Sequence, residues 1–511
     1  MRFLTCLCAI VLSQLALAEV RLPRLISDHM VLQQGRPVRI WGHANAGEQV
    51  RVSLGEHQRE ARADAQGQWE VFLPPMVAGG PYVLRVSASN RIEIQDVLVG
   101  EVWVASGQSN MEWPLERVNN AEQEIAQANF ERVRLFKVVR KTSDVPLDDV
   151  EGTWQPCTPA SARGFSAVAY FFARHLHQRL GVPVGVIQSA WGGTPAQAWT
   201  SMNALKREPA LHYYLRLWDQ VLDDYPAEQL RYDRRRQEWE RQAQLAREQK
   251  QEPPPRPNPP RGPGHPHAPA SLFNAMIAPL TPYAIRGVIW YQGESNAGNR
   301  EDASLYASLF QTMIRDWWEH WGQGPFPFLF VQLANFAKVS ADSAWPELRE
   351  SQTRALELRH TGMAVTIDIG DPDDIHPRNK QDVGLRLALA ARAVAYGEPI
   401  VYSGPLFRQL TREGNRLRLW FDHVGSGLAT RDGSLPKGFL IAGNDRIFHP
   451  AQAVIEGDTI VVWSDQVPEP VAVRYAWAPN PDGNLQNREG LPASPFRTDR
   501  WRNAILPKLG Q

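Results

Sequence analysis

The stretch EVWVASGQSNM, residues 101–111, decides the expected fold. Its first five residues have the length and largely apolar character of a buried strand, and a turn begins at Ser106 and Gly107. Gly107 permits a tight passage from strand to helix, where backbone N–H groups can face an oxyanion. Ligands of open α/β sheets sit beyond the carboxyl ends of the strands. Ser109 is therefore a candidate nucleophile by position, although a serine in such a turn is by itself more often a helix cap.

The segment from 101 to 399 alternates apolar runs of strand length with helical stretches. Two helices are expected at residues 165–180 and 382–396, and each is followed by a glycine, a common stop signal. The further strands expected are residues 184–188, 286–291, 327–333 and 363–369. Such an alternation predicts an α/β domain whose mostly parallel sheet is covered on both faces. Met111 breaks the Gly-x-Ser-x-Gly pattern, which argues against the α/β-hydrolase family.

Two β-rich regions flank this domain, at residues 19–100 and 400–511. Their short alternating runs, punctuated by Gly, Asn and Asp, predict β-sandwich-type modules. Residues 203–270 interrupt the α/β rhythm and are interpreted as an insertion. In it, a helical stretch rich in Arg, Glu and Gln precedes a proline-dominated one, residues 252–269, that we expect to be extended and solvated. The 511 residues are enough for several domains.

Residues 1–18 have the pattern of a signal peptide with cleavage after Ala18. No later stretch has 18 consecutive apolar residues, so we expect an exported protein, periplasmic or extracellular, without a membrane span. Cys157 is the one cysteine beyond the signal, and a buried small hydrophobe is the favoured role over a nucleophile. A formal net charge of zero gives no reason to expect a nucleic-acid partner, and the oligomeric state stays open.

A base for Ser109 is expected in the loop DIGDPDDIHP, residues 368–377, which follows the last predicted strand. Asp373 precedes His376 by three residues, and at that spacing a carboxylate can fold back to the imidazole Nδ1 and stabilise the imidazolium. The alternative interpretation is a metal-binding acidic loop or a solvated turn. The sequence has no HExxH motif and no paired cysteines, and we expect no metal or other cofactor.

Two more predicted strands end in groups that acyl-transfer sites use. In SAWGGT, residues 189–194, two glycines let the backbone approach a ligand closely. QGESN, residues 292–296, begins with an amide that can donate to an oxyanion without adding charge. Each signal is weak alone. Their combination with Ser109 and His376 indicates an acyl-transfer site.

These blocks resemble the SGNH hydrolases and, within them, the sialate O-acetylesterase family of carbohydrate esterases. The matching stretches are GQSNM (107–111), WGGT (191–194), WYQGES (290–295) and DIHP (374–377), with support from FNAMIAPL (273–280) and GLPASPFRTD (490–499). The resemblance implies a flavodoxin-like three-layer α/β/α core with β modules attached. It also implies a serine esterase of carbohydrate metabolism that cleaves acetyl esters on sugar hydroxyls without a cofactor.

The resemblance makes Ser109 the nucleophile and His376 the general base. For the oxyanion hole it implies the Ser109 backbone N–H, the backbone near Gly192 and Gly193, and the side chain of Gln292, where the broad superfamily has Asn.

The third member of the triad is expected at Asp373. Asp371, Asp374 or a backbone carbonyl are the alternatives, because the role is defined by geometry. The side chains that flank the motifs and are expected to contact the sugar are Trp113, Gln197, Trp199, Glu294 and Arg378. For the two tryptophans, packing in the core is at least as strong an expectation.

Three functions follow as hypotheses. The first is a sialate O-acetylesterase, whose substrate carries a carboxylate that an arginine such as Arg378 can clamp. The second keeps the chemistry but acts on acetylated xylan, xyloglucan or another plant glycan. The third is a non-catalytic carbohydrate-binding protein that uses the β modules, which the pairing of Ser109 with His376 disfavours.

Overall fold

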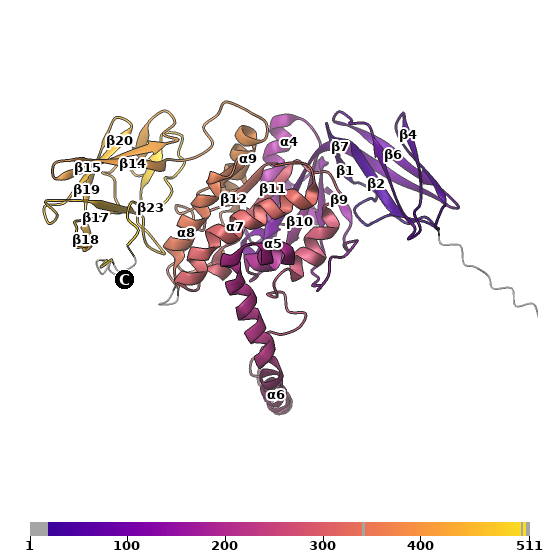
Figure 1. The fold of residues 1–511 in the computed structure, drawn as a ribbon, viewed down its shortest axis with the longest axis horizontal. Helices are drawn as coiled ribbons and strands as arrows, with labels where there is room; N and C mark the ends of the chain where they lie inside the picture. Colours follow the sequence, from indigo (N-terminus) through magenta and orange to yellow (C-terminus); the bar gives the residue numbers. More distant parts are fainter. Residues whose placement is uncertain (1–18, 340–342, 502–503, 507–511) are drawn as a thin grey trace, which may run out of the picture.

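The computed structural model describes residues 19–339, 343–501 and 504–506, so the predicted signal peptide, residues 1–18, lies outside the described residues. Figure 1 shows a central α/β core with one β module at each end and the long helix α6 (His212–Glu248) projecting from the core. The fold class predicted from the sequence is confirmed, with a mixed central sheet and additional β-sheet modules.

The core sheet has the strand order β13-β12-β11-β7-β10-β8-β9. Its neighbours pair in parallel except at the edge, where β9 runs antiparallel to β8. The strands are β7 (Arg91–Gly107), β8 (Phe130–Lys137), β9 (Trp154–Cys157), β10 (Val184–Ala190), β11 (Gly287–Tyr291), β12 (Phe328–Val331) and β13 (Thr361–Ala364). After β7, the chain first forms β8, β9 and β10 on one side of it and then β11, β12 and β13 on the other. The topological switch point, where ligands of open α/β sheets bind, therefore lies at the carboxyl end of β7.

Helices cover this sheet. α4 (Ala167–Leu180) and α9 (Lys380–Val394) contact each other. α4 also contacts β8 and β10, whereas α9 contacts β12 and β13. α7 (Arg300–Trp321) packs with α5 (Met202–Arg207) and α8 (Trp345–Thr353). The helices predicted at residues 165–180 and 382–396 are α4 and α9, each to within two residues, whereas α7 was not predicted.

A single strand joins the N-terminal module to the core. β7 pairs with β6 (Gly79–Ser87) through its first half and with β10 and β11 through its second half. The boundary expected at residue 100 therefore falls inside one continuous strand. The other strands of the module are β1 (Val31–Gln33), β2 (Val38–His43), β3 (Gln49–Leu54), β4 (His57–Arg62) and β5 (Gln68–Leu73).

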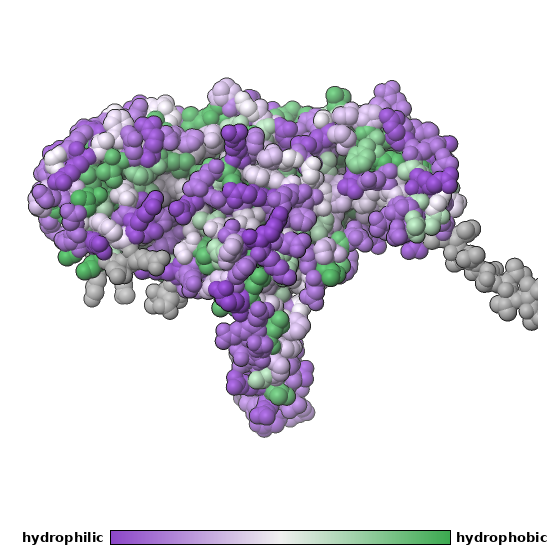
Figure 2. All heavy atoms as spheres, in the orientation of Figure 1, coloured by the Kyte–Doolittle hydropathy of each residue, from purple (hydrophilic) through white to green (hydrophobic). Residues whose placement is uncertain are grey.

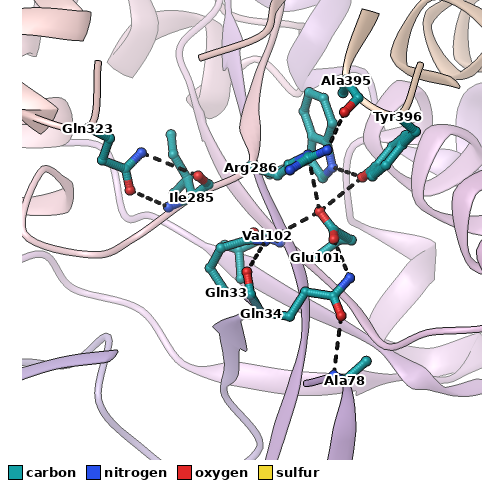
Figure 3. A network of polar contacts seen from close by, with 11 residues as sticks. Gln33, Gln34, Ala78, Glu101, Val102, Ile285, Arg286, Gln323, Ala395 and Tyr396 are labelled. Carbon is teal, nitrogen blue, oxygen red and sulfur yellow. Dashed lines mark hydrogen bonds and ion pairs between the residues drawn. The ribbon is translucent and has the colours of Figure 1, made fainter. Parts of the chain in front are cut away.

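Glu101 marks this junction with a buried carboxylate that is only 2% exposed (Figure 3). Its oxygens accept hydrogen bonds from Gln34 Nε2 at 2.5 Å, Gln33 Nε2 at 3.4 Å and the Tyr396 hydroxyl at 3.0 Å. Arg286 Nε lies 3.7 Å from the same carboxylate. The two glutamines belong to the N-terminal module, whereas Tyr396 and Arg286 belong to the core. One buried charge therefore ties the two units together.

We expect Glu101→Ala to lower the free energy of unfolding by about 2–4 kcal/mol, because it leaves buried donors and a cation without their acceptor. Denaturant titration of the whole chain measures the loss. Glu56→Ala, at an exposed turn, is the matched control and should change little. Equal stability of the two variants would contradict the role given to Glu101.

The insertion forms a stalk. α6 has 37 residues and is about 55 Å long at 1.5 Å per residue. The proline-rich segment packs back along it: Trp239 Nε1 donates to the Pro254 carbonyl at 2.7 Å, and the Arg256 guanidinium lies 5.7 Å from the Trp239 ring. Figure 2 shows that the visible face of the stalk is mainly hydrophilic. The proline-rich segment is largely exposed and outside any helix or strand from Glu252 to Arg261, and it contacts the stalk at Trp239.

The C-terminal module consists of short antiparallel sheets. Its strands are β14 (Leu406–Glu413), β15 (Arg416–Asp422), β16 (Leu428–Thr430), β17 (Phe439–Ala442), β18 (Phe448–Pro450), β19 (Gln452–Glu456), β20 (Thr459–Trp463), β21 (Ala472–Tyr475), β22 (Leu485–Asn487) and β23 (Phe496–Arg497). None of the helices in the described part of the chain combines the length and the apolar character that crossing a bilayer requires. Cys157 is buried, and burial raises the pKa of its thiol to about 12, so it is no nucleophile.

Candidate active site

Ser109 lies at the carboxyl end of β7, as the first residue of α1 (Ser109–Glu112). The turn depends on Gly107, whose φ is +137° and where a Cβ would stand 2.1 Å from the Tyr291 carbonyl oxygen. Only glycine fits that position. The backbone N–H of Gln108 donates to the same carbonyl at 3.0 Å, and that of Trp191 donates to the Gly107 carbonyl at 3.1 Å. The three strand ends thus hold Ser109 at the switch point of the sheet.

His376 faces Ser109. Its Nε2 is 2.9 Å from Ser109 Oγ, a hydrogen-bond distance. Its ring stacks on Trp113, with centroids 4.7 Å apart and planes at 12°. Burial lowers the imidazole pKa from its usual 6.5, while Asp374 opposes that shift. The ring is therefore neutral at pH 7 and able to accept the serine proton.

The carboxylate beside the imidazole belongs to Asp374. Its Oδ1 lies 3.5 Å from His376 Nδ1 and accepts the His376 backbone N–H at 2.9 Å. Asp373, the residue expected there, instead has a side chain that is 76% exposed and lies 3.2 Å from Lys338 Nζ. Asp371 Oδ1 accepts the backbone N–H groups of both following aspartates. This turn sends the two side chains in different directions, so the expectation for Asp373 is wrong.

A buried polar cluster beside the Ser109–His376 pair joins the loops that carry these two residues. Asn110 Nδ2 donates to Glu294 Oε1 at 2.5 Å and to the Ile375 carbonyl at 2.9 Å, while Asn110 Oδ1 accepts from Lys380 Nζ at 2.6 Å. Burial raises the pKa of the Glu294 carboxyl and lowers that of Lys380 to about 7. Because Ile375 precedes His376, Asn110 fixes the histidine loop against the helix that begins at Ser109.

Gly192 adjoins the nucleophile as expected, since a Cβ placed on it would lie 3.2 Å from Ser109 Cβ. Its N–H, however, donates to Glu112 Oε2 at 2.9 Å. Glu112 is itself paired with Arg140, whose NH2 nitrogen lies 2.5 Å from Oε1. One expected oxyanion donor is therefore occupied by a carboxylate in this structure. The neighbouring Gly193 is exposed.

Gln292 does not fill the oxyanion role expected of it. Its amide is fully buried, and Nε2 donates to Asn296 Oδ1 at 2.8 Å and to the Thr194 carbonyl at 3.3 Å. Tyr306 donates to its Oε1 at 2.8 Å. Both amide protons are thereby used, since an amide nitrogen carries two. Gln292 braces the loops on either side of Ser109 from below.

The expected sugar contacts divide into groups. Trp199 is fully buried and donates to Thr194 Oγ1 at 2.9 Å, so packing in the core is its role. Trp113 stacks on the His376 imidazole. Gln197 is half-buried and lines a cavity beside Gly193. Arg378 is exposed and lines a shallow groove.

Glu294, the fifth expected sugar contact, instead binds Asn110. Three residues that shape the site were not expected from the sequence: Asn110, Glu112 and Lys380. Asp374, the imidazole partner, was expected only as an alternative to Asp373. Asn110 stands within the stretch 101–111 and Glu112 follows it directly, so proximity to Ser109 was the available signal. Lys380 follows no pattern in the sequence. Across the described ranges, no group of three or more His, Cys, Asp or Glu side chains is placed to hold a metal ion.

Comparisons with known proteins agree on one family. A family model described as carbohydrate esterase, sialic acid-specific acetylesterase, matches residues 267–395, which contain His376. The sialate O-acetylesterase of Mus musculus is 34% identical over 444 residues, covering 79% of this chain and 79% of the mouse protein. The sialate O-acetylesterase of Homo sapiens is 33% identical over 436 residues, covering 76% of this chain and 73% of the human protein.

A solved structure extends the similarity to the whole fold. A carbohydrate acetylesterase from Xanthomonas citri superposes with a TM-score of 0.81 at 43% identity, covering 94% of this chain and 100% of that one. With identity above 30% over more than two thirds of the sequence, the chain belongs to the sialate O-acetylesterase family and is a carboxylic ester hydrolase of the carbohydrate esterases.

Proposed function

We propose that this protein removes O-acetyl groups from sugar hydroxyls through an acetyl-enzyme formed on Ser109. The observation that carries the proposal is the 2.9 Å contact between Ser109 Oγ and His376 Nε2, two atoms from residues 267 positions apart. A nucleophile and a base within hydrogen-bond reach at a strand end are what acyl transfer needs. The family membership supports esterase action on acetylated sugars.

In the first half of the cycle, His376 Nε2 takes the proton of Ser109 while Oγ attacks the acetyl carbonyl. Asp374 stabilises the imidazolium that forms, because its carboxylate lies 3.5 Å from Nδ1. The tetrahedral intermediate collapses, the C–O bond to the sugar breaks, and His376 returns the proton to the leaving sugar oxygen. The neutral resting state of the buried imidazole supports this direction of proton transfer.

In the second half, water attacks the acetyl-enzyme. His376 takes one proton of the water and gives it to Ser109 Oγ as acetate leaves. No atom in either half requires a cofactor.

The developing oxyanion needs donors near Ser109. The N–H groups at the start of α1 and the loop at Gly192 and Gly193 lie beside the nucleophile. One such donor is worth about 3 kcal/mol of transition-state stabilisation. We propose that Glu112 releases the Gly192 N–H when substrate enters, since its carboxylate would repel a growing negative charge at that position.

The cellular setting is part of the same proposal. The pattern of residues 1–18 supports export to the periplasm or the exterior, where acetylated glycans are encountered. The substrate stays divided between O-acetylated sialic acid and acetylated plant glycans such as xylan or xyloglucan. The names of the relatives support the former, and the chemistry of the dyad serves both.

The test is acetate release by the purified enzyme from O-acetylated sialic acid, acetylated xylan and acetylated xyloglucan, each measured as kcat/KM. We expect turnover of at least one of them and of p-nitrophenyl acetate. Absence of acetate release from every sugar ester would refute the function.

A further inference from the structure

The cavity beside Gly193 has a volume of about 330 Å³ and lies between the active-site loops and the base of the stalk. It falls within the usual size range of small-molecule sites. One wall comes from the first turns of α6, with Tyr214, Leu217, Trp218 and Val221. These positions follow the spacing i, i+3, i+4, i+7, so they share one face of the helix. That wall is apolar and aromatic, and Leu217 remains 43% exposed.

The facing walls are polar. Gln197 and Ser295 come from the loops after β10 and β11, Asp302 from the first turn of α7, and Arg261 and His267 from the proline-rich segment. Among the described residues, Asp302 Oδ1 is a buried oxygen without a hydrogen-bond partner. The other oxygen, Oδ2, accepts from Asn299 Nδ2 at 3.5 Å. Buried acceptors in folded proteins are normally satisfied, so Oδ1 can accept a hydrogen bond from a ligand hydroxyl.

The cavity is connected to the catalytic loops by direct contacts. His267 lies against the backbone of Gly193, and a Cβ placed on the adjacent Gly192 would stand 3.2 Å from Ser109 Cβ. Ser295 N–H donates to Gln108 Oε1 at 3.2 Å, and Gln108 immediately precedes Ser109. Gly193 and Ser295 both line the cavity. A molecule held in it would therefore lie against the loops that flank the nucleophile.

We propose that this cavity is a subsite for a sugar ring adjoining the acetylated one, so that the enzyme prefers O-acetylated oligosaccharides to single acetylated sugars. The inference rests on the proposed function and assigns the insertion a part in it. A pyranose ring has an apolar face and a rim of hydroxyl groups. The apolar face matches the wall of Leu217 and Trp218, and the hydroxyl rim matches Asp302 and Gln197.

Charge distinguishes the two substrate classes at this subsite. Arg261 is an exposed cation on the cavity wall, and a guanidinium pairs with carboxylates. A sialic acid carboxylate would need it, whereas a neutral ring would need only Trp218, Asp302 and Gln197. Gln197 Oε1 accepts from Asn296 Nδ2 at 3.0 Å, so its amide nitrogen is the group left to donate, while Asp302 Oδ1 accepts. Because a donor and an acceptor lie opposite the apolar face of α6, we assign the subsite to a neutral, hydroxyl-rich ring.

The experiment compares two substrates in the same preparation: acetylated xylo-oligosaccharides and p-nitrophenyl acetate, which is too small to span both sites. The readout is kcat/KM for the acetylated xylo-oligosaccharide divided by kcat/KM for p-nitrophenyl acetate. Any loss of folded enzyme cancels from this ratio. Trp218→Ala is expected to lower this ratio tenfold or more, and Asp302→Asn to lower it less. Leu230→Ser, further out on α6 and 62% exposed, is the matched control and should keep the wild-type ratio.

Binding provides a second readout that does not depend on catalysis. Calorimetric titration of unacetylated xylotetraose and of sialyllactose into Ser109→Ala should show that adding Trp218→Ala weakens xylotetraose binding about tenfold. An unchanged ratio together with unchanged xylotetraose affinity would overturn the subsite. So would sialyllactose binding that Arg261→Gln abolishes while xylotetraose does not bind. Loss of all sugar-ester turnover in the wild type would instead count against the proposed function, and the titration would still decide the subsite.

Discussion

Replacing Ser109 by alanine is expected to lower kcat for acetate release by about 10⁴-fold or more. The variant lacks the one oxygen that stands 2.9 Å from His376 Nε2, so no acetyl-enzyme can form. Release of acetate from an O-acetylated sugar, followed over hours at high enzyme concentration, measures the residual rate. The fold should be unaffected, because Ser109 opens α1 without a side-chain cap and its neighbours hold the turn.

The double variant Ser109→Ala/His376→Ala sharpens this test. Since the two side chains act as one unit, His376→Ala alone should cost a similar factor, and the double variant should be little worse than either single one. Additive losses would mean that the two residues act separately, which contradicts the dyad. The matched control is His360→Ala, at an exposed turn position just before β13.

Asp374→Asn is expected to lower kcat by about 10²-fold or more, whereas Asp373→Asn should stay within about twofold of the wild type. Adjacent aspartates thus provide a matched pair. Asp374 lies 3.5 Å from His376 Nδ1 and stabilises the imidazolium, but the Asp373 carboxylate is directed toward Lys338 and solvent. A larger loss in Asp373→Asn than in Asp374→Asn would restore the residue first expected from the sequence.

The pH profile separates an electrostatic role of Asp374 from a merely structural one. Activity requires neutral His376, so it rises with pH through the pKa of the imidazole. Burial lowers that pKa below its usual 6.5, and Asp374 pulls it back up. Removing the negative charge should therefore lower the pKa further and move the acid limb of kcat/KM to lower pH, while the plateau falls. A limb that stays in place would show that Asp374 acts only through the loop conformation.

The Ser109 and Asp374 variants change a site whose residues come from segments far apart in the chain. Asn110 follows Ser109 directly and donates to the Ile375 carbonyl next to His376, so one side chain links the segments that carry Ser109 and His376. Lys380 at the start of α9 and Glu294 in the turn after β11 complete that buried cluster. The geometry of the dyad is thereby coupled to the packing of the core.

Some of the architecture was readable from the sequence because local signals are strong there. Three predicted apolar runs are buried central strands: the run before Ser109, residues 184–188 and residues 286–291. Gly181 ends α4 in the left-handed conformation, as the glycine stop signal predicted. The strand β8 was not identified. Its charged Arg134 obscures the apolar pattern, and only the fold shows that Asp96 neutralises it at 2.6 Å.

By itself, then, the sequence determined the α/β class, the position of Ser109 at a strand end and its pairing with His376, because strand length, a glycine turn and motif order are properties of the chain. The tertiary structure alone decided which aspartate adjoins the imidazole, that Gln292 is a buried brace, that Glu112 occupies the Gly192 N–H, and that the insertion walls a cavity beside the site. Those outcomes depend on the direction in which a side chain leaves a turn and on which hydrogen-bond partners lie within its reach in the folded chain. Such facts arise only when segments far apart in the chain are brought into contact.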